Sequence, residues 1–141
     1  MLSNIVRLNV VQYGEPFGLS VDASRVAVGS CIFQWAEDGS ERPIAFASLK
    51  LTTTQQAWAT VEMEAFAVIW SLQKFRNLTF GAHIIVYSDH NPLTFVTEGL
   101  TKSAKLMRWA LALQEYNIEF RYRPGSKNVV ADCLSRLCDN S

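Results

Sequence analysis

The hydrophobic pattern of the chain changes from strand-like to helix-like near residue 52, and this change limits what it can fold into. Before it, three short strand-like segments follow one another through tight turns: Phe17–Ser24, Ala27–Trp35 and Arg42–Leu49. The first alternates apolar and polar residues, as a half-buried strand does, and EDGS at residues 37–40 is a strong turn signal. The pattern predicts an antiparallel meander.

Helical spacing follows and is interrupted by one apolar run. Thr53 and Gln56 resemble a capping box that opens a helix, and apolar residues recur at helical spacing up to about Asn77. AHIIVYS at residues 82–88 is typical of a strand buried in a sheet centre. The remaining segments are expected as a short helix, a helix, a strand and a terminal helix: Pro92–Thr97, Ser103–Tyr116, Asn117–Tyr122 and Asn128–Leu137. This order predicts an α/β domain with a mixed sheet.

The length of 141 residues fits one domain. We expect residues 1–16 to be a lead-in, residues 17–138 to be the domain and residues 139–141 to be a tail. The three scattered cysteines give neither a disulfide framework nor a zinc spacing. No apolar run approaches the roughly 18 residues of a membrane span, and the N-terminus has no signal-peptide layout. We therefore expect an intracellular protein that is not secreted and has no membrane partner.

The charge balance gives only weak support for nucleic-acid binding. Lys+Arg and Asp+Glu both total 13, so the net charge is zero, whereas phosphate neutralisation requires basic residues on the binding face. From Thr101 onward, however, basic residues outnumber acidic ones by seven to four. The C-terminal part therefore carries a slight basic excess.

Acidic residues stand where a ligand site is often built. Asp22 lies inside the first predicted strand, although Asp is depleted from strands. Asp89 ends the apolar run, at the carboxyl end of a strand, where α/β sheets bind ligands. Asp132 falls in the first turn of the last predicted helix, and the long helix offers Glu62 and Glu64. Carboxylates that converge from these elements would repel one another unless hard cations such as Mg²⁺ or Mn²⁺ lay between them.

Plainer interpretations stand beside this one. A single Asp near a strand end is more often a turn former or a cap, and Asp132 could simply complement a helix dipole. At about 100° per residue, Glu62 and Glu64 flank the main apolar stripe at similar angles on opposite sides. Helical geometry therefore does not choose between the two glutamates.

Five segments, taken in order, carry a resemblance to a known family. They are FGLSVDAS, RPIAFASLKL, TVEMEAFAVIWSLQKFRNLTFG, VYSDHNPL and RWALALQEYNIEFRYRPGSKNVVADCLSR, and they cover nearly everything from Phe17 to Leu137. The chain resembles the ribonuclease H domain of gypsy-type LTR-retrotransposon reverse transcriptases. The resemblance implies the ribonuclease H-like fold, a five-stranded mixed sheet with three antiparallel strands and then two parallel ones, flanked by helices on both faces.

The resemblance also implies a site and an activity. Asp22, Glu64, Asp89 and Asp132 fall on the family's catalytic, metal-binding positions, and Glu64 is chosen because the family's Glu is the second in the E-x-E pattern. Two Mg²⁺ ions, or Mn²⁺ as a substitute, would support hydrolysis of the RNA strand of RNA–DNA hybrids during reverse transcription. The implied partners are the hybrid and a polymerase domain in a parent polyprotein, located in a cytoplasmic particle or the nucleus.

Three basic residues near the C-terminus are the expected substrate contacts. Arg121, Arg123 and Lys127 are expected to contact phosphates, with solvated surface charge as the equal alternative for each. The loop at residues 121–127 has no His, which related cellular enzymes carry before the last carboxylate.

The alternative function is a non-catalytic module, domesticated or tethered, that binds nucleic acid or protein. An integrase or transposase shares the fold, but the YRPGSKNVVADCLSR ending argues against it.

Overall fold

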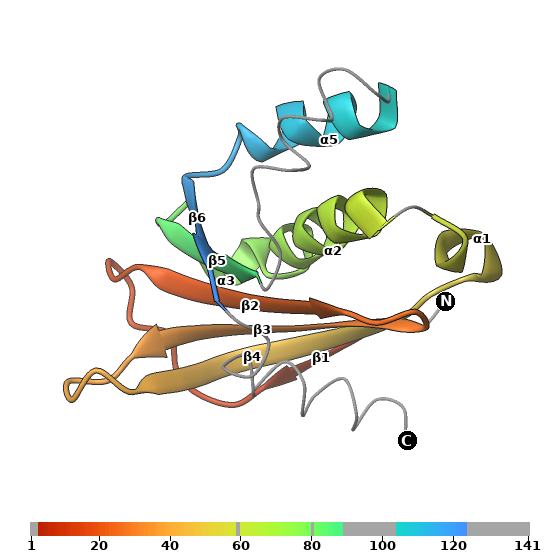
Figure 1. Ribbon diagram of the computed structural model, residues 1–141. Coiled ribbons are helices and arrows are strands. Elements are labelled where there is room, and N and C mark those ends of the chain that lie inside the picture. Colours follow the sequence, from red (N-terminus) through yellow and green to blue (C-terminus); the bar gives the residue numbers. More distant parts are fainter. Residues whose placement is uncertain (1–2, 59, 80, 89–103, 124–141) are drawn as a thin grey trace.

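The computed structural model describes residues 3–58, 60–79, 81–88 and 104–123, which build a mixed sheet with helices (Figure 1). The strands are β1 (Ser3–Arg7), β2 (Phe17–Ala23), β3 (Ala27–Trp35), β4 (Glu41–Lys50), β5 (Ile84–Ser88) and β6 (Ile118–Tyr122). The helices are α1 (Thr53–Gln56), α2 (Thr60–Lys74), α3 (Arg76–Thr79) and α5 (Ala104–Leu113). The helices expected at Pro92–Thr97 and Asn128–Leu137 lie outside the described residues.

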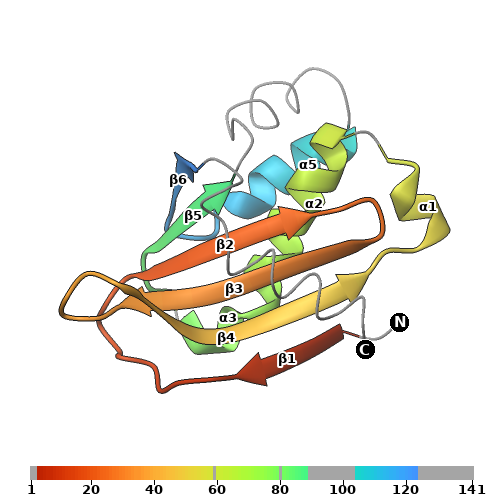
Figure 2. The ribbon, with the colours of Figure 1, turned by 60° about the horizontal axis from the view of Figure 1, so that its bottom comes forward.

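The sheet has the order β1-β4-β3-β2-β5-β6 (Figure 2). Strands β2, β3 and β4 pair antiparallel, whereas β5 pairs parallel with both β2 and β6. The expected arrangement of three antiparallel and two parallel strands is thereby confirmed. One strand was not expected: β1, from within the expected lead-in, pairs antiparallel with β4 and becomes a sixth strand at the edge.

The hydrophobic core lies between the sheet and α2. Side chains alternate between the two faces of a strand, and the face of β2 toward α2 carries Phe17, Leu19 and Val21, all buried. From α2, the buried residues Val68 and Leu72 belong to the same core. The second layer is α5, which packs on α2 (Figure 1). This core fixes the position of α2 relative to the ends of the central strands.

The prediction of a single long helix from Thr53 to Asn77 is wrong in detail, because this part of the chain forms three separate helices, α1, α2 and α3. Thr52, not Thr53, is the N-cap: its hydroxyl accepts from Gln55 N–H at 3.1 Å, and the Gln55 side chain accepts from Thr52 N–H at 2.9 Å. This closed capping box belongs to the four-residue helix α1, and α2 begins separately at Thr60. In the described part of the chain, none of the helices has the length and apolarity needed to cross a membrane.

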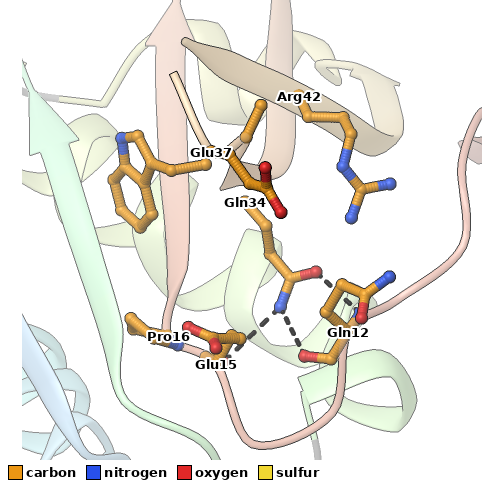
Figure 3. A pocket seen from close by; sticks show the side chains of 8 residues that line it. Gln12, Glu15, Pro16, Gln34, Glu37 and Arg42 are labelled. Carbon is orange, nitrogen blue, oxygen red and sulfur yellow. Dashed lines mark hydrogen bonds between the residues drawn. The ribbon is translucent and has the colours of Figure 1, made fainter. Parts of the chain in front are cut away.

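The residues between β1 and β2 are anchored on the sheet by Gln34, a buried residue of β3 (Figure 3). Its side-chain oxygen accepts from Gln12 N–H at 2.8 Å, and its amide nitrogen donates to Gln12 C=O at 2.9 Å. Arg42 adds a bond from its guanidinium to Val10 C=O at 3.1 Å. These contacts border a hollow of about 580 Å³ that also reaches Glu37. Part of the expected lead-in therefore packs against the domain.

Candidate active site

Asp22 is held by a central strand and a fastened turn. Its strand, β2, is paired on both sides, and Asp22 lies opposite Gly29 of β3. The next turn is closed by Ser24, whose hydroxyl accepts from Ala27 N–H at 3.1 Å, and by Leu51 N–H, which donates to Val26 C=O at 2.8 Å. The half-buried Asp22 side chain therefore projects from a rigid position.

The parallel neighbour β5 ends beside Asp22. In the observed register, Ser20 of β2 is opposite Tyr87 of β5, so Asp22 lies two residues beyond this pair. Ser88 is the last residue of β5, and Asp89 follows it directly in the sequence. Asp89 itself lies outside the described residues. The carboxyl ends of β2 and β5 thus lie side by side at one edge of the sheet.

Glu64 reaches this same edge from α2. Its half-buried side chain lines a small hollow together with Val21 and Ala23 of β2 and Ser88 of β5. Glu62 is not among the residues that line it. Of the two glutamates, Glu64 is therefore the one that lines this hollow, and its role in catalysis stays a prediction.

A larger hollow opens next to Glu64, and its walls include residues to which the sequence pattern gave no role in a site. It has a volume of about 400 Å³, and its walls include Arg25 from the β2–β3 turn, Gln56 from α1 and Trp58. Trp58 packs edge-to-face on Phe66, with ring centroids 5.4 Å apart. Because nothing in the sequence signals that α1 and this turn face each other across a hollow, only the fold reveals this wall.

The described donors suit a hard divalent cation, although they form only part of the predicted set. Asp22 and Glu64 both offer carboxylate oxygens, the ligand type that Mg²⁺ and Mn²⁺ prefer. Within the described residues, no group of three His, Cys, Asp or Glu side chains could hold a metal ion. Asp89 and Asp132 lie outside those residues, so the convergence of all four carboxylates stays a prediction.

The predicted phosphate contacts have different surroundings. Arg121 is exposed and forms an ion pair with Glu119, which raises the pKa of its guanidinium. The side chain of Arg123 is only 15% exposed and pairs with Glu41 at 2.6 Å. Lys127 lies outside the described residues. The contact of these residues with phosphate is therefore untested, and Arg123 already has a carboxylate partner.

Solved structures with the same arrangement define the class of fold. RNase H1 from the archaeon Halobacterium salinarum NRC-1 is 19% identical, with a TM-score of 0.61 over 89% of this chain and 99% of the other. The foamy viral protease-reverse transcriptase solved with an RNA/DNA hybrid is 23% identical, with a TM-score of 0.65 over 79% of this chain and 16% of the other. The domain has the ribonuclease H fold.

Sequence comparison then gives the family. The model of the RNase H-like domain found in reverse transcriptase matches residues 12–116, and the chain belongs to this family. In Drosophila melanogaster, the Retrovirus-related Pol polyprotein from transposon opus is 46% identical over 126 residues, and that from transposon gypsy is 36% identical over 137 residues. These matches cover 89% and 96% of this chain, but only 12% and 13% of the polyproteins.

Proposed function

We propose that this domain is a metal-dependent endonuclease that hydrolyses the RNA strand of RNA–DNA hybrids during reverse transcription. The observation that carries the proposal is the position of Glu64, which lines a hollow with the carboxyl ends of β2 and β5. Strand β2 carries Asp22, and β5 leads directly into Asp89. In a member of the reverse-transcriptase RNase H-like family, this edge of the sheet is the natural place for phosphodiester hydrolysis.

The carboxylates would act by binding and orientation. Asp22, Glu64, Asp89 and Asp132 would together hold two Mg²⁺ ions, or Mn²⁺ in their place. When bound, such ions lower the pKa of a coordinated water and stabilise charge on the transferring phosphate. The fastened turn at Ser24 and the core contacts of α2 would keep Asp22 and Glu64 in place, so that little reorganisation is needed during the reaction.

The residues that line the hollow beside Glu64 support a nucleic-acid substrate. Arg25 offers a cation for a phosphate, and Trp58 offers an aromatic surface for a base or sugar. An RNA–DNA hybrid as the substrate is further supported by the foamy viral protease-reverse transcriptase, which has a similar fold and was solved with an RNA/DNA hybrid. The neutral net charge is compatible with this substrate if bound cations neutralise the carboxylates and the phosphate together.

The parent of this domain is proposed to be a polyprotein with a polymerase domain, acting in a cytoplasmic particle or the nucleus. The support is the small share, 12% and 13%, of the Pol polyproteins that the chain spans. A polymerase domain would add contacts to the hybrid that this domain, with a net charge of zero, supplies only in part. We therefore expect hydrolysis by the isolated chain to need low salt.

The proposal is tested by cleavage of a labelled RNA strand, with the whole chain at low salt and either Mg²⁺ or Mn²⁺. We expect cutting of RNA hybridised to DNA, no cutting of single-stranded RNA or duplex DNA, and loss of cutting in Asp89→Asn. Retained cutting in that variant would contradict the assignment of the site. No cutting with either metal by a folded chain, even after fusion to a polymerase domain, would favour the non-catalytic binding module.

A further inference from the structure

Arg123 links the two chain segments that lead to Asp89 and Asp132. Its backbone N–H donates to Ser88 C=O at 2.8 Å, and Ser88 is the residue directly before Asp89. Arg123 itself follows the last residue of β6, nine positions before Asp132. One residue therefore fastens the end of β5 to the start of the C-terminal segment.

The side chain of Arg123 extends this link across the sheet. Its guanidinium carbon lies 3.9 Å from the ring centroid of Tyr87, and Tyr87 stacks on Phe33 of β3 with centroids 6.0 Å apart. A guanidinium over an aromatic ring is an attractive cation–π contact. Tyr87 is opposite Ser20 of β2, so these contacts lie on the face of the sheet that also carries Asp22.

Glu41, at the start of β4, completes the arrangement. Its carboxylate accepts from the two terminal guanidinium nitrogens of Arg123 at 2.6 and 3.5 Å, although 82 residues separate the partners. The two side chains are only 15% and 30% exposed, so water screens the pair less than it screens a surface pair. Burial, together with the negative charge of Glu41, raises the pKa of the Cys31 thiol to about 12.

We propose that Arg123, held by Glu41 and Tyr87, is a positioning residue that fixes the carboxyl end of β5, the strand that leads into Asp89, relative to β4 and β6. The proposal rests on the proposed nuclease function and changes the expected role of Arg123. A guanidinium that already has a carboxylate and an aromatic partner would have to leave both to bind a phosphate. Lys could not replace it, because an ammonium lacks the planar shape for simultaneous pairing and stacking.

The first test measures positioning without activity. Amide hydrogen exchange of the metal-free chain is compared for the wild type, Arg123→Gln, Glu41→Gln and the control Glu37→Gln, which removes the same charge from the neighbouring exposed turn. We expect Arg123→Gln and Glu41→Gln, but not the control, to exchange about tenfold faster in peptides that cover the ends of β5 and β6, with exchange in α2 unchanged. Unchanged exchange in those peptides, or exchange that is already unprotected in the wild type, would overturn the proposal whether or not the chain is a nuclease.

The second test separates positioning from phosphate binding. For a positioning role, Arg123→Gln and Glu41→Gln should each lower kcat and raise the Mg²⁺ needed for half-maximal rate, and the double variant should be no worse than either. The salt dependence of hybrid binding should not change. If Arg123 instead binds a phosphate, Arg123→Gln should reduce that slope by about 0.7–0.9, and Glu41→Gln should leave binding unchanged or tighter. That second pattern would overturn the proposal.

Discussion

At the scale of single residues, Gly18 is constrained by the ring of Phe33. A Cβ atom added at Gly18 would lie 2.3 Å from two ring carbons of Phe33. That ring cannot move away easily, because it is 1% exposed and packs on Trp35 and Tyr87. The close approach of β2 and β3 here supports the strand that carries Asp22.

We therefore predict that Gly18→Ala lowers the free energy of unfolding by about 1–3 kcal/mol, the usual cost of overpacking a core. Urea denaturation measures this change. In a Phe33→Leu background the same substitution should cost clearly less, because the two ring carbons that the new methyl group would meet are absent. Equal costs in the two backgrounds would show that Phe33 is not the reason for glycine at this position.

The candidate site was predictable residue by residue only where a short motif carried it. Asp22 was noticed because Asp is unusual inside a strand, and Asp89 because it follows an apolar run directly; sequence pattern can recognise both positions. The choice of Glu64 over Glu62 required the family resemblance, because both flank the apolar stripe of the helix equally. Arg25 gave no such signal, since its place beside Glu64 depends on how the β2–β3 turn meets α1 and α2.

At the scale of elements, the strands followed the sequence closely and the helices less so. Strands β2 and β3 lie within a residue of the expected ranges, because alternation and turn residues are local signals. The division into α1, α2 and α3 was missed, because apolar spacing continues across the breaks. Strand β1 was also missed: an edge strand of five residues depends on its partner β4 more than on its own pattern.

The segment between β1 and β2 depends on one side chain, and this gives a prediction. Gln34→Glu removes the amide that donates to Gln12 C=O and places an acceptor against a carbonyl. We expect a loss of about 1–3 kcal/mol in unfolding free energy, the cost of an unsatisfied buried polar group, and faster amide exchange at residues 8–16. Gln12→Ala is the matched control, since only the backbone of Gln12 makes these bonds. Equal effects of the two changes would contradict this anchoring role.

In the whole molecule, one spatial relation supports the proposed site: helix α2 brings Glu64 to the edge where β2 and β5 end. The fold and the family are those of the RNase H-like domain found in reverse transcriptase, and Glu64 lines the hollow beside Ser88, whereas Glu62 does not. Sequence pattern alone predicted the order of β2 to β6 along the chain but could not place α2 over the strand ends. That placement comes from the long-range packing of α2 on β2.

The most direct measurement is the hybrid-cleavage rate of Glu64→Gln beside that of Glu62→Gln. The two variants remove the same charge from the same helix at positions two residues apart. Only Glu64→Gln removes a carboxylate that lines the hollow at the strand ends. We predict that Glu64→Gln lowers the rate by about 10²–10⁴-fold, as removal of a catalytic group commonly does, while Glu62→Gln stays within about twofold of the wild type. Equal losses in both variants, or a loss in Glu62→Gln alone, would contradict the site.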